Sequence, residues 1–467
     1  MHAKVASRIR YVNRRGLYLK QKLHATVQNF SVYLPAAPRC KIPALMEKPM
    51  FNALSRSLLM LLVLTTLTSL TALAQTPAAE FQTLHSFAGG PADGAYPSQA
   101  LVFSKAGDLF GATIDGGSNT SECYGYGCGG MFELQPKSGK WKESLPYSFS
   151  ASSSEFLNPE GTIVLDSHGN VYGTQSLGGD PDCQCGVVYE LSRIGGVWTE
   201  IILHTFTGGT ADGQYPNSGL IADSAGNLYG VTESGGEYDG GGTFFELSPN
   251  GDGGFTYNII YQFGQSSGYD AQDPSGPLSM DSQGNIYGTS ASGGSYGYGA
   301  VFKLSPSNGS WTESVLFNLT IDYGNYPNPW GVVPDSAGNL YGTATDGGPY
   351  GVGTVYKLTP QTGFWKRTIL YTFSGSGDGA YPFGLAISSS GTLYGAADSG
   401  GSFGYGNVYQ IQSVNGKWMQ SVLHEFTNGT DGEHPFGNLI FDSQGNLYGT
   451  AQSGGTYGFG TVFEITP

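Results

Sequence analysis

The stretch Asp442-Ser443-Gln444-Gly445-Asn446-Leu447-Tyr448-Gly449-Thr450 decides the fold of this chain of 467 residues, because it is the last of seven copies. The central aromatic recurs every 53 to 62 residues, and in every copy a Gly-Gly pair begins six residues after it. The aromatics are Phe110, Tyr172, Tyr229, Tyr287, Tyr341, Tyr394 and Tyr448, and the pairs begin at Gly116, Gly178, Gly235, Gly293, Gly347, Gly400 and Gly454. A repeat of this length indicates a solenoid or a propeller.

Each copy has the pattern of four short antiparallel strands. In the fifth copy, Trp330–Val333 and Leu340–Thr343 flank a turn sequence with Asp and Gly, which form tight hairpins. A glycine-rich loop then leads to the alternating segment Thr354–Leu358, and Trp365–Phe373 supplies the fourth strand. Four such strands in each period of about 55 residues are what one propeller blade requires.

The two ends of the repeat region complement each other. Residues 81–87 match the fourth strand of other copies, such as 422–426, whereas the chain ends on a third strand at 461–465. We therefore predict an all-β fold, a seven-bladed β-propeller of four-stranded antiparallel blades closed by the N-terminal strand (about 81–87), which completes the C-terminal blade. An open β-solenoid is the alternative, and it would not need this complementarity.

The first 74 residues differ from the repeats. Lys48 and Arg56 precede an apolar run that ends in Ala72-Leu73-Ala74, which is typical of a signal peptide over residues 46–74. Residues 1–45 carry nine basic residues, and we interpret them as a mis-annotated start or a disordered basic extension. The propeller then spans 75–467, with no stable membrane span after signal cleavage. We expect a secreted or periplasmic protein.

The mature chain is strongly acidic. Residues 75–467 contain 10 basic and 35 acidic residues, a formal charge of −25. Such a surface repels phosphate backbones, so nucleic acid is not an expected partner. Glycans and proteins remain the ligand classes to consider, and a monomer is predicted.

Four cysteines lie in the longest loops between second and third strands. They are Cys123, Cys128, Cys183 and Cys185. In an exported protein this placement favours disulfides, within each loop or between neighbouring loops. A four-sulfur metal site is the alternative, although the spacings Cys-x4-Cys and Cys-x-Cys fit zinc poorly.

The loop that precedes the first strand of most blades carries an Asp and an aromatic or His. The candidate ligand-binding residues are Asp93, Tyr96, Asp212, Tyr215, Asp322, Tyr326, Asp378, Tyr381, Asp431 and His434, whereas the fourth blade keeps only Asp273-Pro274. These loops and the Gly-Gly loops emerge on one face. That face could hold a sugar by stacking and carboxylate hydrogen bonds, or a hard cation such as calcium through oxygen ligands. Alternatively, Asp-Gly and Tyr-Pro only form the turn between blades.

Two further repeated positions receive a structural interpretation. A Trp opens the fourth strand in five copies and is expected to pack between blades. His85, His204 and His424 occupy a fourth-strand position that holds Tyr or Phe in the other copies, so we interpret them as substitutes for an aromatic.

Known catalytic motifs are absent from the sequence. No nucleophile elbow, zinc-type His-Glu-x-x-His, phosphate-binding loop or dinucleotide pattern occurs in a suitable context. No catalytic residue, metal ligand or other cofactor is therefore assigned.

The three recurring segments Asp-Ser-x-Gly-Asn-Leu-Tyr-Gly-Thr, Ser-Gly-Gly-x-Tyr-Gly-x-Gly-Thr-Val-Phe and Leu-Tyr-x-Phe resemble the GloVer tandem-repeat family of exported bacterial proteins across residues 81–467. Members of that family have varied C-terminal anchors, whereas this chain stops at Pro467, which suggests release or periplasmic retention. The order of Gly pair, aromatic and Trp is also similar to kelch propellers. The family implies no established activity.

Two hypotheses about function follow. The first is a non-catalytic binding or scaffold module that engages a glycan or protein through the acidic, aromatic loop face. The second is a carbohydrate-active hydrolase or lyase that uses face carboxylates.

Overall fold

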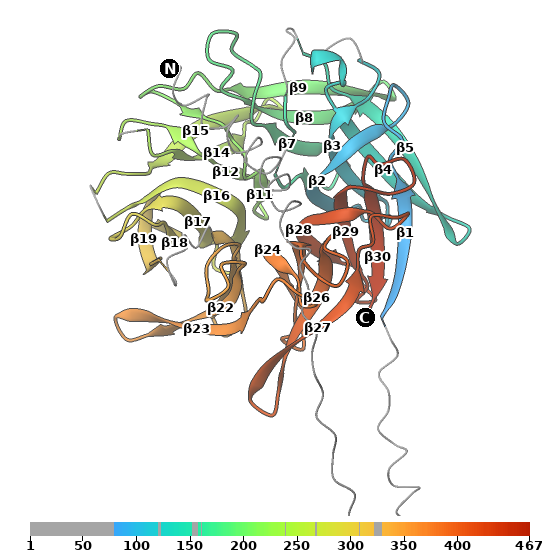
Figure 1. The fold of residues 1–467 in the computed structure, drawn as a ribbon. Helices are drawn as coiled ribbons and strands as arrows, with labels where there is room; N and C mark the ends of the chain where they lie inside the picture. The colour runs from blue at the N-terminus through green and yellow to red at the C-terminus, as the bar shows by residue number, and fades with distance from the viewer. Residues whose placement is uncertain are drawn as a thin grey trace, which may run out of the picture. The chain divides into compact units, whose positions relative to one another are not determined.

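The computed structural model describes residues 79–119, 123–151, 157–159, 161–238, 240–266, 269–307, 309–321 and 329–467. They form seven four-stranded antiparallel sheets that follow one another around a ring (Figure 1). The predicted seven-bladed propeller is confirmed. The basic extension and signal peptide predicted for residues 1–74 lie outside the described residues, as do Asp322 and Tyr326.

The strands of blades one to six run in chain order from the axis of the ring to its rim, whereas in blade seven the outermost strand is the N-terminal β1. Blades one to four contain β2 (Gly94–Phe103), β3 (Leu109–Gly116), β4 (Gly130–Lys137) and β5 (Lys140–Ser148); β6 (Val164–Leu165), β7 (Val171–Gln175), β8 (Val187–Ile194) and β9 (Val197–Thr205); β11 (Leu220–Ala222), β12 (Leu228–Thr232), β14 (Thr243–Pro249) and β15 (Phe255–Gln262); β16 (Ala271–Met280), β17 (Ile286–Gly293), β18 (Ala300–Ser307) and β19 (Ser310–Asn318).

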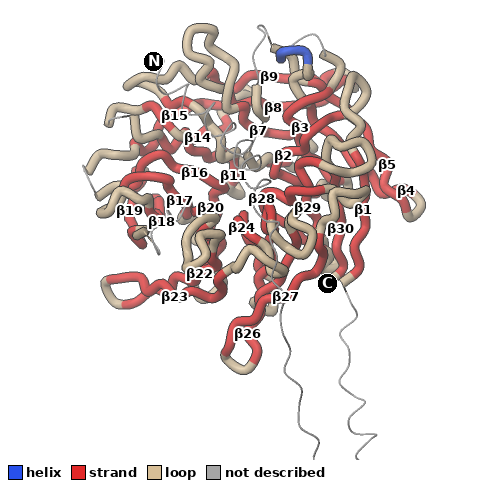
Figure 2. Tube along the Cα trace, viewed as in Figure 1, coloured by secondary structure: helices blue, strands red, loops and turns tan. Residues whose placement is uncertain are grey.

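Blades five to seven contain β20 (Pro329–Pro334), β21 (Leu340–Ala344), β22 (Thr354–Gln361) and β23 (Phe364–Thr372); β24 (Ala380–Ile387), β25 (Leu393–Ser399), β26 (Asn407–Val414) and β27 (Lys417–Glu425); β28 (Glu433–Phe441), β29 (Leu447–Ser453), β30 (Thr461–Thr466) and β1 (Glu80–Ser86). A small ribbon joins β10 (Gly213–Gln214) to β13 (Ser234–Gly235). Figure 2 shows how strands dominate, with the short 3-10 turn η2 (Cys123–Gly125) in blue.

The repeated Tyr-Gly of the second strand follows from how the blade packs. In blade seven, a Cβ placed on Gly449 would lie 2.6 Å from the ring of Phe463 on the neighbouring strand. Gly230 meets Phe245 and Gly395 meets Tyr409 in the same way. The glycine therefore leaves room for a fully buried third-strand aromatic to lie across its neighbour, and each blade gains its largest core side chain.

The turn between first and second strands is fixed by its Asp. In blade seven, Asp442 Oδ1 accepts hydrogen bonds from the N–H groups of Gln444 and Asn446, at 2.8 and 2.9 Å. Its Oδ2 accepts from the Asn446 side chain and from the Tyr448 hydroxyl, at 2.8 and 3.2 Å. Asp166, Asp223, Asp281 and Asp335 make the same set of bonds in their own blades.

The N-terminal strand closes the ring. β1 pairs antiparallel with β30, from Glu80 opposite Thr466 to Ser86 opposite Thr461. Phe87 follows at the end of the strand, fully buried against Phe132 of blade one at a centroid distance of 5.1 Å. The predicted complementarity of the two ends is therefore confirmed, and the strand also joins blade seven to blade one.

The first strands pack tightly near the axis. Gly161 and Gly219, in neighbouring blades, approach so closely that a Cβ on Gly219 would lie 2.0 Å from the amide nitrogen of Thr162. Leu220 N–H donates to Thr162 O at 2.9 Å, and Thr162 Oγ1 donates to Leu220 O at 2.7 Å. These blades are therefore joined through their backbones.

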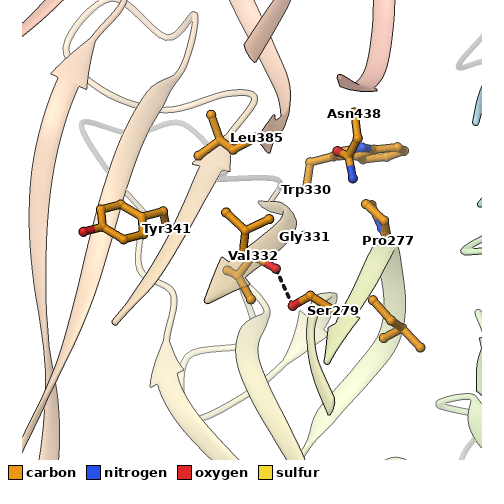
Figure 3. A pocket seen from close by; sticks show the side chains of 10 residues that line it. Pro277, Ser279, Trp330, Gly331, Val332, Tyr341, Leu385 and Asn438 are labelled. Carbon is orange, nitrogen blue, oxygen red and sulfur yellow. Dashed lines mark hydrogen bonds between the residues drawn. The ribbon is translucent and has the colours of Figure 1, made fainter. Parts of the chain in front are cut away.

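Between blades four to seven, large rings fill the axial region. Trp330, Phe383 and Phe436 meet with centroid distances of 4.5 to 5.6 Å. The cavity beside them has a volume of about 20 Å³, and Figure 3 shows side chains that line it, among them Trp330, Pro277 and Asn438. Such a space holds a single water molecule rather than a ligand.

The long loops of the first two blades carry disulfides. Cys123 pairs with Cys128, and Cys183 pairs with Cys185. The predicted disulfides are confirmed, and of the two pairings that the sequence left open the structure has the one within each loop. Among the described residues, no helix has the length and apolar content needed to cross a membrane.

Candidate functional site

The predicted loop carboxylates are used within their own turns. Asp93 accepts hydrogen bonds from Ala88 N–H at 2.8 Å and from Gly94 N–H at 2.7 Å. Asp212 accepts from the N–H groups of Thr207 and Gly213, at 3.0 and 2.8 Å. Asp378 and Asp431 make equivalent bonds to Ser374 and to Thr427. These bonds define the turn between blades and hold each carboxylate in place.

The fourth-strand position that carries His or Tyr bonds to the same carboxylates. His85 Nε2 lies 3.2 Å from Asp93 Oδ2, and His204 Nε2 lies 3.0 Å from Asp212 Oδ2. In blade five the Tyr371 hydroxyl donates to Asp378 at 3.1 Å. The histidines therefore occupy the same structural place as the tyrosines.

Sequence reasoning missed one member of this set. Asp270 of blade four accepts from Gln265 N–H at 2.8 Å and from the Tyr261 hydroxyl at 3.0 Å, as the loop Asp does in other blades. The sequence pattern places the motif of this blade at Asp273, whereas in the structure Asp273 occupies the Tyr position. The signal was present, because Asp270 precedes Pro274 by four residues, just as Asp93 precedes Pro97.

The Tyr position of the motif has a left-handed backbone. φ is 55° at Tyr96, 62° at Tyr215, 56° at Tyr381, 54° at His434 and 51° at Asp273. The N–H of each donates to a carbonyl in the Gly-Gly loop of the preceding blade, for example Tyr96 to Phe459 at 2.8 Å. This backbone bond links neighbouring blades. The ligand-binding role predicted for these side chains remains a prediction.

Blade four adds a second carboxylate to its loop Asp. Asp270 Oδ1 and Glu313 Oε1 are both buried with no hydrogen-bond donor. Burial, followed by the charge of Asp270, raises the pKa of Glu313 from 4.5 to about 8. With its pKa at about 8, Glu313 keeps its proton at neutral pH, and the protonated side chain can donate a hydrogen bond to Asp270.

We predict that Glu313→Gln will stabilise the protein at alkaline pH. Because the folded chain binds this proton more tightly than the unfolded chain, the stability it contributes is complete below about pH 4.5 and is lost as the pH rises through about 8. Glutamine keeps the hydrogen bond without the charge. The free energy of unfolding in urea should therefore exceed that of the wild type by about 1–2 kcal/mol at pH 9 and match it at pH 4.

The exposed Glu237 supplies the control for this prediction. Glu237→Gln removes the same charge from the surface and should shift stability little and equally at both pH values. A pH-independent effect of Glu313→Gln would contradict the raised pKa of Glu313.

The opposite face of the ring contains the candidate ligand site, a cleft of about 580 Å³ between blades one and two. Its walls come from the first hairpin of each blade and from the third and fourth strands. Residues that line it include Ser104, Lys105, Asp108, Phe110, Glu133, Gln135, Asp166, His168, Asn170, Arg193 and Trp198. Volumes of 300–1,000 Å³ are typical of sites for small molecules.

Blade one departs from the repeat at this cleft. The turn that reads Asp-Ser-x-Gly-Asn in blades two, three, four, five and seven, and Ser388-Ser389-Ser390-Gly391-Thr392 in blade six, reads Ser104-Lys105-Ala106-Gly107-Asp108 here, and Phe110 stands where the six other blades have Tyr. Phe110 has no hydroxyl to bond the turn, and Ser104 Oγ instead accepts hydrogen bonds from Ala106 N–H and Asp108 N–H, at 3.2 and 3.0 Å. The Tyr-to-Asp bond that closes this region in five blades is therefore missing.

Blade two departs from the repeat at the same cleft. Arg193 stands opposite Trp198, where blades one, three, four and five place a proline opposite the first aromatic of the fourth strand. The Arg193 guanidinium lies 4.8 Å from the Trp198 ring centroid and 3.8 Å from Glu133 Oε2. Gln135 also donates to Glu133, at 3.1 Å. The result is an aromatic and cationic wall next to a buried carboxylate.

The far wall offers a carboxylate that stays ionised. Burial alone would raise the pKa of Asp166, but hydrogen bonds from the N–H groups of Asn170 and His168, and from the side chains of Tyr172 and Asn170, outweigh burial and lower that pKa. The cleft thus combines fixed acceptors with the flexible donors Lys105 and Arg193. No sequence pattern indicates that the residues by which blades one and two differ from the repeat line one cleft.

The comparisons with solved structures show similarity of fold only. The extracellular domain of a proposed one-component system from B. thetaiotaomicron is 11% identical with a TM-score of 0.46; the alignment covers 82% of this chain and 39% of that one, so this chain spans well under half of its length. A protein of unknown function from Dyadobacter fermentans is 11% identical with a TM-score of 0.41, and the alignment covers 84% of this chain and 100% of that one. Pseudomonas fluorescens PhoX in complex with vanadate is 11% identical with a TM-score of 0.42, and the alignment covers 84% of this chain and 95% of that one.

A search of curated protein sequences finds no match. The profile of the Gloeobacter/Verrucomicrobia repeat, in contrast, matches residues 120–328 and 273–467. These two matches together cover most of the propeller, in agreement with the resemblance carried by the repeated segments, and the chain belongs to the Gloeobacter/Verrucomicrobia repeat family.

Proposed function

We propose that this protein is an exported, non-catalytic binding module that holds a carbohydrate in the cleft between blades one and two. One observation carries the proposal: the departures of blade one and blade two from the repeat, at Ser104, Phe110 and Arg193, all line the same cleft. Repeated positions are explained by the packing of blades, whereas departures that converge on one cavity are explained by a ligand.

The chemistry of the cleft suits a ligand rich in hydroxyl groups. Asp108 and Asn170 offer acceptors, while Lys105, Arg193 and Gln135 offer donors. A sugar hydroxyl both donates and accepts, so it can bridge such mixed walls. Trp198 and the stacked Arg193 supply a flat surface for the apolar face of a sugar ring.

The proposed location outside the cytoplasm is supported by the two disulfides. Disulfide bonds persist in oxidising compartments such as the periplasm and the extracellular space. Carbohydrate polymers are abundant there, and the strong negative charge of the mature chain disfavours nucleic acid as a ligand.

A glycan array with the mature chain tests the proposal. We expect a defined set of glycans to bind, and the double variant Ser104→Asp/Phe110→Tyr to bind them more than tenfold more weakly, because it puts the Asp and Tyr of the repeat at the two positions where blade one departs from it beside the cleft. The matched control is Asp335→Ser/Tyr341→Phe, which makes the inverse change in blade five and should leave glycan binding unchanged.

Two outcomes would count against this function. Binding that is equal in the wild type and in Ser104→Asp/Phe110→Tyr would place the ligand elsewhere on the propeller. A silent array together with a protein partner that the same variant fails to bind would keep the cleft but replace the carbohydrate.

The hydrolase hypothesis has weaker support. The face carboxylates that it requires are engaged in their turns, as Asp93 and Asp212 show with two backbone hydrogen bonds each. A general acid or a nucleophile needs a carboxylate that faces the substrate.

A further inference from the structure

A group of three side chains recurs where neighbouring blades meet. The first member is the His or Tyr on the fourth strand of one blade, and the second is the loop Asp that follows it in the chain. The third member comes from the fourth strand of the next blade, where it pairs with a Leu or Ile of the third strand. One example is His204, Asp212 and Tyr257, in which Tyr257 pairs with Leu247. Another is His424, Asp431 and Phe81, in which Phe81 pairs with Ile465.

In both of these groups an aromatic ring fills the third place. Tyr257 stacks on His204 with a centroid distance of 3.5 Å, and Phe81 stacks on His424 at 3.6 Å. The imidazole is thereby sandwiched between the blades, and no space is left beside it.

The join between blades seven and one differs. Its group is His85, Asp93 and Glu143, and Glu143 pairs with Leu134 in the same register as its counterparts. A carboxylate therefore replaces the stacked ring. Its Oε1 is buried and has no hydrogen-bond partner. One ligand atom from each of the three residues lies within 4.8 Å of the others.

We propose that His85, Asp93 and Glu143 bind a divalent transition-metal ion of the zinc type, which clamps the join where the ring closes. One imidazole nitrogen and two carboxylate oxygens form a donor set that zinc accepts, with water in the fourth position.

The distance between His85 and Asp93 fits one edge of a tetrahedral zinc site. Ligand atoms at the usual zinc distances are separated by about 3.3 Å, and His85 Nε2 lies 3.2 Å from Asp93 Oδ2. The N–H groups of Ala88 and Gly94 fix the Asp93 carboxylate, as outer hydrogen bonds do in metal sites. A rotation of the Glu143 side chain brings its unpartnered oxygen to the ion, and the metal compensates the buried negative charge.

The experiment uses the mature chain without an affinity tag, freed of metal with EDTA. Titration calorimetry with zinc chloride should give one site per chain, and cobalt should give the visible absorption of a tetrahedral centre. At a zinc concentration 100 times the dissociation constant, the melting temperature should rise by about 3 °C.

Three variants locate the site. His85→Tyr should abolish binding yet fold, because Tyr371 already makes the equivalent bond to Asp378. Glu143→Gln should weaken binding more than tenfold. Glu313→Gln changes the same repeat position in blade four, where Tyr261 replaces the histidine, and should bind zinc as the wild type does. A wild type that binds no zinc, or a His85→Tyr variant that binds it equally, would overturn the proposal.

Discussion

Deletion of β1 together with Phe87 should cause the largest loss of stability of any change in this protein. The deletion removes the outer strand of blade seven and exposes the edge of β30 from Thr461 to Thr466. It also removes Phe87, which is fully buried between blades seven and one. Loss of one buried Phe costs about 3–5 kcal/mol, and the unpaired strand adds to this. We expect urea unfolding to lose its single cooperative transition.

A chain that begins at residue 79 is the control, because it keeps the strand. A synthetic peptide of residues 79–89 added to the deleted protein should restore the urea midpoint by pairing with β30. If the deleted protein unfolds at the same urea concentration as the control, the closure does not hold the ring.

Gly219→Ala should cause the second largest loss. At this position φ is +76°, and the new Cβ would lie 2.0 Å from the nitrogen and 2.3 Å from the oxygen of Thr162, both backbone atoms of the neighbouring blade. These atoms belong to the bonds that join blades two and three, so the blades must separate. We expect the free energy of unfolding to fall by about 4 kcal/mol or more, measured by urea denaturation.

Gly226→Ala is the matched control in the same blade. Its φ of +86° imposes the same conformational strain, but the nearest atom to its Cβ is 3.6 Å away on Pro249. Strain alone costs about 1–2 kcal/mol. Equal losses for the two variants would show that the contact with Thr162 contributes nothing.

Repetition explains how much of the fold could be predicted. Seven copies of one pattern define the strands, and the match of residues 81–87 to a fourth strand predicts the pairing of β1 with β30. The disulfides followed from the placement of the cysteines in long loops. Each of these predictions depends only on local pattern and order along the chain.

The candidate cleft depends on contacts that the repeat does not encode. Phe110 for Tyr and Arg193 for Pro are each an unremarkable change within one copy. They become informative only when blades one and two pack side by side, which brings both to the same cavity. The same holds for Glu143 of blade one, because its partner His85 lies on β1 in blade seven and Asp93 lies in the loop between these two blades.

The pairing of β1 with β30 also constrains the order of assembly. Among the described strands β1 is synthesised first and its partner β30 last, so β1 waits longest for its partner. Until β30 is present, blade seven cannot complete its sheet, and the cluster that buries Phe87 lacks Val462. A contact between strands so distant in sequence makes folding slow, and the ring can close only after β30 has been synthesised.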